Sequence, residues 1–446
     1  MNDFFLKLLP NFIKTKVEGR FNLQKILSNI GWQSFDKFFR MGIGIFVSVW
    51  VTRFLGPEQF GALSYAIAFS GIFSSLASLG LDGIIIRELS QKNESRDNLL
   101  GTAFLLKLCG AVLAYSLIII LIFLIKSTDY NTIFLVAIIA FGLFFNSFDV
   151  IDLWFQSQLK YKFTFYAKNT AFTISSILKI IMILLNAPLF YFAIITTIEV
   201  FFGAAGLIFV YKLRKNNLNN WTASLVLAKT LMAESWPLII AGFATFIYMK
   251  IDQVMLGTML NNKEVGIYSA AIKFSEIWYF IPGAIYASVF PVLAEYKKKN
   301  ERLFFLKYKK VCSIMVLISV IIALIMTFLS NYLINLLYGK EFIQAGPILS
   351  VHIWAGVFVF IGVAGSIWTM IEGLQKFQLF ATGLGGITNI LLNIILIPRY
   401  AGMGSAFATV ISYAIASYLV YFFAPKNRKV ALILTNSLFF PWRSFR

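Results

Sequence analysis

The stretch Val51–Phe69, VTRFLGPEQFGALSYAIAF, joins two long apolar segments through a short turn, Gly56–Gln59. Proline lacks the N–H that continues a helix and glycine continues one only at a cost, so the turn separates two helices. A variant, KEVGIYSAAIKF, recurs at Lys263–Phe274 and places Gly266 where the first copy has Gly61, 205 positions earlier. The stretch therefore predicts a helical hairpin whose second helix is used twice in the chain.

Further short matches keep the same order at nearly the same spacing. They pair Lys107-Leu108-Cys109 with Lys310-Val311-Cys312, Lys162-Phe163 with Lys376-Phe377, and Ile174 and Ile181 with Ile387 and Ile394. A collinear set of matches at one period indicates an internal repeat. We therefore predict four parts: a basic amphipathic N-terminal segment (1–28), an N-lobe (29–218), a C-lobe (219–424) and a basic cytoplasmic tail (425–446).

Composition indicates a membrane protein. Of the 446 residues, 59% are hydrophobic and only 13% are charged, about half the charged fraction of a typical soluble domain. The apolar residues come in runs of about 20, the length of helix that crosses the hydrocarbon of a bilayer. We predict an all-α polytopic membrane protein with twelve transmembrane helices near 30–55, 61–86, 99–125, 132–156, 164–185, 188–211, 230–257, 266–290, 311–337, 345–371, 377–397 and 402–424.

The distribution of basic residues predicts the orientation. Lys and Arg in the tails and in alternate loops number 27, whereas the remaining loops hold five, namely Arg53, Lys126, Lys263, Lys340 and Arg399. Because cytoplasmic loops carry the excess of Lys and Arg, both termini are expected in the cytoplasm. Six helices per half would relate the halves by an axis along the membrane normal.

Several classes of function are excluded by what the sequence lacks. One histidine, His352, and two cysteines within apolar segments offer no metal cluster and no disulfide framework. The loops are too short for a catalytic domain, and no GxxxxGK[ST] motif is present, so we expect neither an enzyme nor an ATP-driven pump, and no cofactor. The basic residues behind the net charge of +19 are distributed among the loops and are not gathered in one domain, so we expect no binding of nucleic acid.

Ionisable side chains inside the apolar segments need a partner, a wet cavity or a function. A cavity lined by bases would suit an anionic substrate. The candidates for such a cationic site are Arg40 and Lys250, followed by Lys179, Lys107 and Lys273. Four other charged residues are interpreted as local pairs or as side chains that reach the interface: Lys37, Asp149, Asp152 and Lys168.

The remaining acids have two interpretations. Glu199 and Asp252 are candidate sites for a coupled proton or cation, with a structural role beside a nearby lysine as the alternative. Two further acids are candidate structural partners, because each lies about one helical turn from a base: Asp36 beside Arg40, and Glu276 beside Lys273. Arg40 itself can either bind substrate or serve only to pair with Asp36.

The stretches NIGWQSFDKFFRMGIGIFVSVWVTRFLGPEQFGALSYAIAF, DQVMLGTMLNNKEVGIYSAAIKFSE and ITNILLNIILIPRYAGMGSAFATVISY resemble bacterial oligosaccharide flippases of polysaccharide biosynthesis, which export O-antigen and other repeat units. These flippases belong to the multidrug/oligosaccharidyl-lipid/polysaccharide exporter (MOP) superfamily. The resemblance covers residues from about 23 to 423. It implies a MATE-like fold of two six-helix lobes around a central, often cationic cavity, which works by alternating access.

The resemblance also implies a function. Family members move undecaprenyl-pyrophosphate-linked repeat units from the inner to the outer face of the bacterial cytoplasmic membrane. The expected partners are the lipid-linked oligosaccharide, membrane lipids, polysaccharide polymerase and chain-length proteins, and a coupling proton or sodium ion. Two alternatives remain: a cation-coupled drug exporter of the same superfamily, which would favour a more acidic cavity, and a non-transporting membrane protein of the glycan pathway.

Overall fold

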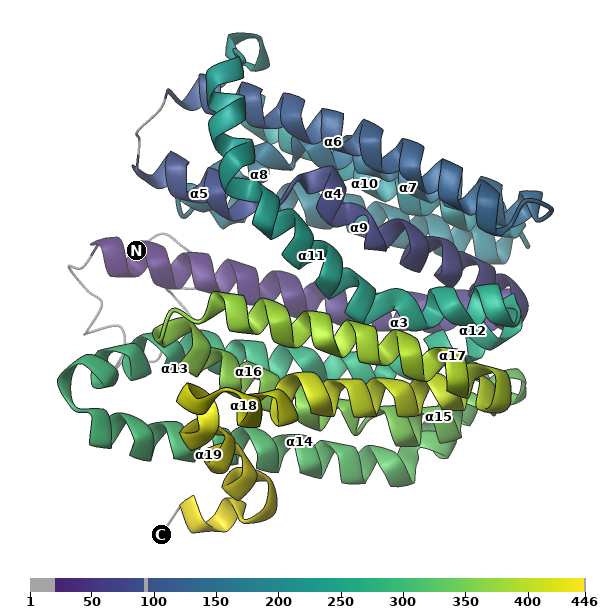
Figure 1. Ribbon diagram of the computed structural model, residues 1–446. Helices are drawn as coiled ribbons and strands as arrows, with labels where there is room; N and C mark the ends of the chain where they lie inside the picture. The colour runs from purple at the N-terminus through teal and green to yellow at the C-terminus, as the bar shows by residue number, and fades with distance from the viewer. Residues whose placement is uncertain (1–20, 92–94, 445–446) are drawn as a thin grey trace. The chain divides into compact units, whose positions relative to one another are not determined.

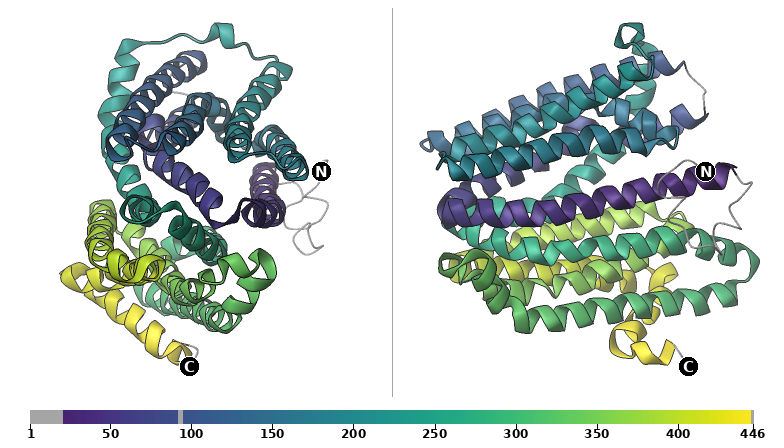
Figure 2. Two further views of the ribbon diagram at one scale, coloured as in Figure 1. Left: turned by 90° about the vertical axis from the view of Figure 1, so that its right-hand side faces the viewer. Right: turned by 180° about the vertical axis from the view of Figure 1, so that it is seen from behind.

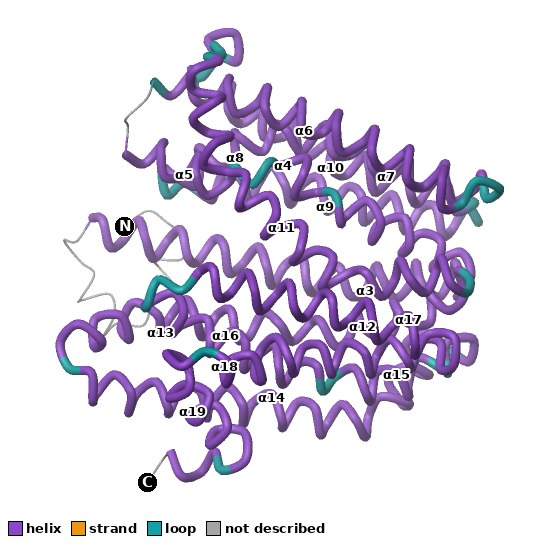
Figure 3. The backbone as a smooth tube through the Cα atoms, viewed as in Figure 1, coloured by secondary structure: helices purple, strands orange, loops and turns teal. Residues whose placement is uncertain are grey.

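The computed structural model describes residues 21–91 and 95–444, so most of the predicted N-terminal segment, residues 1–20, lies outside the described residues. Within the described residues the backbone is helical throughout, apart from turns and short loops (Figure 3). Ten of these helices are long and apolar enough to cross a membrane. The chain is therefore an all-α, multi-pass membrane protein.

Two of the ten helices are broken in the middle. Gly56 interrupts the first with φ 65° and ψ 175°, and Pro57 follows as the first residue of the next helix. Ala401 interrupts the last with φ 47° and ψ −132°. Separated at these two breaks, the described helices are consistent with the predicted twelve spans, and the first break confirms the turn expected at Gly56.

The chain divides into two compact units. Unit 1 comprises residues 1–54 and 69–243, and unit 2 comprises residues 55–68 and 244–446. Two helices, both drawn in Figure 1, contribute to both units: α3 (Phe21–Ile72) and α11 (Leu225–Met259). This grouping by contacts differs from the predicted lobes, because 55–68 belongs with unit 2 and 219–243 with unit 1.

Unit 1 packs its remaining spans side by side, with α9 along α10 and α6 along α7 (Figure 1). Its helices besides parts of α3 and α11 are α4 (Ser74–Ser78), α5 (Asp82–Gln91), α6 (Arg96–Ile125), α7 (Tyr130–Phe145), η1 (Asn146–Phe148), α8 (Asp149–Ser157), α9 (Tyr161–Leu184), α10 (Leu189–Leu213) and η2 (Leu218–Asn220).

Unit 2 holds the remaining spans and a folded C-terminal segment (Figure 2). Its helices are α12 (Asn262–Glu276), η3 (Ile277–Tyr279), α13 (Phe280–Lys299), α14 (Glu301–Tyr338), η4 (Lys340–Phe342), α15 (Ala345–His352), α16 (Ala355–Ile371), α17 (Gln375–Ala414), η5 (Ile415–Leu419), α18 (Val420–Phe423), η6 (Pro425–Asn427), α19 (Arg428–Phe439) and η7 (Pro441–Ser444).

The predicted second span, 61–86, is not one continuous helix. The helix that follows Gly56 ends at Ile72, and the backbone becomes left-handed at Leu79 (φ 53°) and Gly80 (φ 62°). A Cβ on Gly80 would contact the backbone of Leu238 and Ile239 in α11, so glycine also permits this close approach. The apolar run continues through these turns, which is why hydropathy alone did not reveal them.

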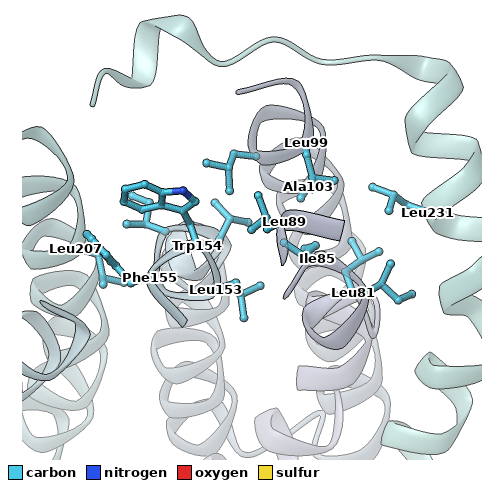
Figure 4. Packing of buried hydrophobic residues seen from close by; sticks show 14 of the residues in the cluster. Leu81, Ile85, Leu89, Leu99, Ala103, Leu153, Trp154, Phe155, Leu207 and Leu231 are labelled. Atoms are coloured by element: carbon cyan, nitrogen blue, oxygen red, sulfur yellow. The ribbon is translucent and has the colours of Figure 1, made fainter. Parts of the chain in front are cut away.

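The core of unit 1 explains why the first half of α11 belongs to it. Leu81, just before α5, and Ile85 and Leu89 of α5 pack with α6 and α8, and Leu231 of α11 joins the same buried cluster (Figure 4). Leu231 is only 2% exposed. Burying a leucine of this kind contributes about 1.5–3 kcal/mol, so the apolar face of α11 anchors this segment in unit 1.

Two glycines of the repeat make a reciprocal contact inside unit 2. A Cβ on Gly61 would fall against the carbonyl oxygen of Asn262 and the backbone nitrogen of Gly266. A Cβ on Gly266 would fall against the carbonyl oxygen of Pro57 and the backbone nitrogen of Gly61. The two contacts are equivalent, because Asn262 and Gly266 lie 205 residues after Pro57 and Gly61. The second hairpin helix and α12 therefore meet backbone to backbone, as two equivalent copies related by a local two-fold would.

We expect Gly266→Ala to destabilise the protein by about 1–3 kcal/mol, because the added methyl group has no space and the two backbones must separate. The measurement is the midpoint of thermal unfolding of the purified protein. Gly71→Ala on α3 is the matched control, since nothing lies within 4 Å of its Cβ position. Equal midpoints for the two variants would contradict the close contact of the two helices.

Candidate functional site

The first polar cluster of unit 1 surrounds Asp36 of α3. Arg40, one turn later on the same helix, donates from Nε to its carboxylate at 3.0 Å. Tyr161 of α9 donates to the same carboxylate at 2.7 Å, and Asn169 of α9 donates a third bond. The pairing of Asp36 with Arg40 is therefore present, as the spacing predicted. Among the described residues neither Nη atom of Arg40 has a hydrogen-bond partner.

The second cluster joins α9 to α10 through Glu199. Ser175 and Lys179, one turn apart on α9, donate to Glu199 at 2.5 and 3.3 Å. No acid lies one turn from Lys179 in the sequence, because its partner comes from the neighbouring helix. A base predicted to bind substrate and an acid predicted to bind an ion are thus each other's partners.

The third cluster is built on Lys168 of α9. Its ammonium lies 2.9 Å from Asp149 and 2.7 Å from Asp152 at the start of α8. Thr164 donates a further bond to Asp152. The expected local pairing of these residues is confirmed, and it fixes α8 against α9.

These clusters meet at one pocket of about 190 Å³ inside unit 1. Two cations and two anions line it from four helical elements: Arg40, Lys168, Asp149 and Glu199. Gly203 of α10 leaves open space on one wall, since nothing lies within 4 Å of its Cβ position. The charges of the lining are balanced, and the guanidinium of Arg40 has donors to spare. The pocket can therefore accept the polar part of a ligand within otherwise apolar helices.

Unit 2 contains a different kind of polar centre, around Asp252 of α11. The residue is only 4% exposed. Tyr268, Thr409 and Asn393 donate to its carboxylate at 2.8, 2.5 and 2.6 Å. Asn393 donates in turn to Asn389. No lysine or arginine of the described part of the chain forms an ion pair with Asp252, so the centre has neutral donors only.

The chemistry of this centre follows from burial. A carboxylate removed from water and given no counter-ion is costly in its charged form, so it favours either a proton or a bound cation. The oxygen atoms of Asp252, Thr409, Ser405 and the two asparagines are hard ligands of the kind that small cations prefer. The residues present therefore fit the predicted role of Asp252 better than the alternative of a partner for lysine.

The other predicted bases are not among the residues that line the unit 1 pocket. Lys107 pairs with Asp82 of α5 at 2.6 Å and does not line the pocket. Lys250 pairs with Glu276 at 3.3 Å between α11 and α12. Lys273 is exposed and places its ammonium 5.9 Å from the ring centre of Phe60 in unit 2. Glu276, a candidate structural partner expected beside Lys273, forms an ion pair with Lys250 of α11.

The neutral side chains that surround the unit 1 pocket and Asp252 were not predicted from the sequence. Asn389 and Asn393 lie one turn apart on α17, and Ser405 and Thr409 repeat that spacing beyond the break. The pattern that could have predicted them is an amide or hydroxyl side chain at every fourth residue of an apolar helix. Within the described residues no group of three or more His, Cys, Asp or Glu side chains is arranged to hold a metal ion, and both cysteines are free.

Residues 50–347 match the model of the family described as polysaccharide biosynthesis protein. Two curated relatives come from Haloferax volcanii. The probable low-salt glycan biosynthesis flippase Agl15 is 25% identical over 43% of this chain and 41% of its own length. The probable flippase AglR is 23% identical over 86% of this chain and 80% of its own length. The chain thus aligns with less than half of the first relative and with most of the second.

Solved structures share the fold. An inward-facing MATE multidrug resistance transporter of the MOP superfamily matches with a TM-score of 0.74 and 15% identity, covering 89% of this chain and 95% of its own. The lipid II flippase MurJ in an inward closed conformation matches with a TM-score of 0.66 and 18% identity, covering 92% and 91%. The predicted MATE-like fold is confirmed.

Proposed function

Because the chain belongs to the family of polysaccharide biosynthesis proteins, we propose that it is a flippase that moves a lipid-linked oligosaccharide across the membrane. The relatives named as a probable low-salt glycan biosynthesis flippase and a probable flippase support this function. The observation that carries it is the charged pocket of unit 1, which offers a polar headgroup a place among apolar helices. A flippase needs such a place because an unshielded pyrophosphate in hydrocarbon is prohibitively costly.

Arg40 is the proposed ligand of the headgroup. Its Nε is used by Asp36, while its Nη atoms remain available at the pocket. A planar guanidinium binds phosphate oxygens through parallel hydrogen bonds and stays charged at every physiological pH. Four lysines are proposed to contact the same substrate in other conformations of the protein: Lys250, Lys179, Lys107 and Lys273. In this structure Lys250, Lys179 and Lys107 are each held by an acid.

Asp252 is the proposed site of the coupling proton or sodium ion, and Glu199 is the second candidate. Asp252 is preferred because its described partners are neutral, whereas Glu199 already bonds Lys179. A pyrophosphate carries about two negative charges, and their outward movement is favoured by about 2.3 kcal/mol per charge for each 100 mV of inside-negative potential. Ion binding at Asp252 would add a second driving force.

The finer assignment follows the resemblance described above. We propose an undecaprenyl-pyrophosphate carrier, a bacterial cytoplasmic membrane with both termini inside, and a surface polysaccharide such as O-antigen as the product. The proposed partners downstream are a polysaccharide polymerase and a chain-length protein. Alternating access by the two predicted lobes would carry the headgroup from the inner to the outer face.

The decisive experiment measures flipping in proteoliposomes of defined composition. Lipid-linked oligosaccharide is placed in both leaflets, and a glycosidase added outside reports the fraction that becomes accessible with time. We expect complete digestion with the protein and about half without it. Digestion of only half in both cases would refute the flippase and leave a non-transporting role. If the protein instead takes up a cationic dye, and the dye inhibits flipping of the oligosaccharide, the drug exporter would be favoured.

A further inference from the structure

The C-terminal segment of unit 2 forms a short amphipathic helix, α19, beyond the last span. Its buried face consists of Val430, Ala431, Leu434 and Ser437, all 0% exposed. Figures 1 and 2 show α19 running across the long helices of unit 2 and not alongside them. Over residues 428–439, the predicted basic tail is therefore a helix docked on unit 2.

Specific contacts fix α19 on the neighbouring helices. Ser313 of α14 donates to Ser437 at 3.1 Å, and Trp368 of α16 donates to Asn427, just before α19, at 3.0 Å. The ammonium of Lys429 lies 3.5 Å from the ring centre of Phe305 on α14. The helix is therefore held at the level of residues 305–313 of α14.

That level corresponds to the edge of the membrane. With 38 residues, α14 is about 57 Å long at 1.5 Å per residue, while the hydrocarbon is about 30 Å thick. Its first ten residues include Arg302, Lys307 and Lys310, all exposed, and its apolar run starts at Val311. The segment around residues 305–313 thus lies where hydrocarbon gives way to headgroups.

The outward side of this region combines apolar and basic residues. Leu432, Phe439 and Trp442 are each 58% exposed. Lys426, Arg428 and Lys429 are exposed beside them. No aspartate or glutamate occurs from Pro425 to Arg446. Glu301 of α14 acts on Lys429 from the neighbouring helix, and the segment itself contributes cations only. An apolar side next to an excess of cations, in a helix that lies across the spans, is typical of segments in an anionic lipid interface.

We propose that α19 with Lys426, Arg428 and Lys429 is a binding site for anionic phospholipid headgroups. Leu432, Phe439 and Trp442 enter the acyl boundary, and the three cations hold the phosphates of the surrounding leaflet. The site is independent of the transported substrate and of the pocket in unit 1. Because of this site, the attachment of unit 2 to the membrane depends on the charge of the surrounding lipid headgroups.

The test titrates the purified full-length protein with dioleoylphosphatidylglycerol or dioleoylphosphatidylcholine and follows bound lipid by native mass spectrometry. The wild type should prefer the anionic lipid, and the preference should shrink as ionic strength rises. The triple variant Lys426→Gln/Arg428→Gln/Lys429→Gln should bind phosphatidylglycerol about tenfold more weakly, with phosphatidylcholine binding unchanged. Leu432→Ser/Phe439→Ser should weaken both lipids, because the apolar contact does not distinguish headgroups.

The matched control is Lys160→Gln/Lys212→Gln/Lys215→Gln, which removes the same charge from exposed positions of unit 1. We expect it to change phosphatidylglycerol binding less than twofold. An equal loss in both triple variants would mean that binding follows net charge, and the proposed site would be refuted. Unchanged binding in the α19 variant, with its thermal unfolding intact, would equally refute it and leave the exposed face to a protein partner.

Discussion

Arg40→Ala should lower the rate of oligosaccharide flipping by about 10- to 100-fold while the protein still folds. The loss corresponds to one charge-assisted hydrogen bond to phosphate at about 1.5–3 kcal/mol, with about 1.4 kcal/mol for each factor of ten. Stability should fall by less, because Asp36 keeps its bonds from Tyr161 and Asn169. The rate is measured by glycosidase protection, and stability by thermal unfolding in the same preparation.

Two further substitutions separate binding from structure. Arg40→Lys keeps a cation beside Asp36 but loses the planar pair of Nη donors, so flipping should fall while stability stays near that of the wild type. Tyr161→Phe is the matched control, since it removes one bond to Asp36 and leaves Arg40 in place. If Tyr161→Phe slows flipping as much as Arg40→Ala, the cluster is structural. The cluster is also structural if adding Asp36→Asn to Arg40→Gln restores the flipping rate that Arg40→Gln alone loses.

Asp252→Asn should make flipping insensitive to sodium and proton gradients. The substitution keeps the volume of the side chain and an oxygen for Tyr268 and Thr409. It removes the charge that binds a proton or cation, and its amide nitrogen replaces the oxygen that accepts from Asn393. Removing a buried charge that has no counter-ion costs little and can stabilise, so folding should persist. The measurement is the initial rate with and without each gradient. Asp252→Ala should lose about 3 kcal/mol of stability, because three buried donors lose their acceptor.

Ser412→Ala is the control for Asp252. Ser412 bonds Asn389 in the same network but does not touch the carboxylate. We expect this variant to respond to ion gradients like the wild type. A wild-type response in Asp252→Asn would exclude Asp252 as the coupling site. The same assay on Glu199→Gln would then test the second candidate.

Local chemistry made part of the fold predictable. The helix break at Gly56 was expected because glycine and proline act through their own backbones, whatever surrounds them. The break at Ala401 falls in the gap expected between the predicted spans 377–397 and 402–424, where Pro398 and Gly402 give the same kind of signal, although alanine itself is a good helix former. The left-handed turn at Gly80 was hidden because flanking leucines keep the segment apolar.

The candidate site was predictable only within one helix. Asp36 and Arg40 are four residues apart, so their pairing followed from the sequence. The partner of Lys179 comes from another helix, and no spacing rule within a helix locates it. The donors around Asp252 are asparagine, threonine and tyrosine, which are common enough in membrane helices to carry little information alone.

The reciprocal contact of Gly61 and Gly266 limits how far the two halves can diverge. If the two halves are the copies that the repeat predicts, each would change independently wherever it has its own neighbours. Here each glycine is the neighbour of the other copy, so a side chain gained in one half is resisted by the backbone of the other. A larger residue at either position requires both helices to move together. This crossing is therefore expected to preserve the ancestral sequence longest and to remain the best place to recognise the repeat.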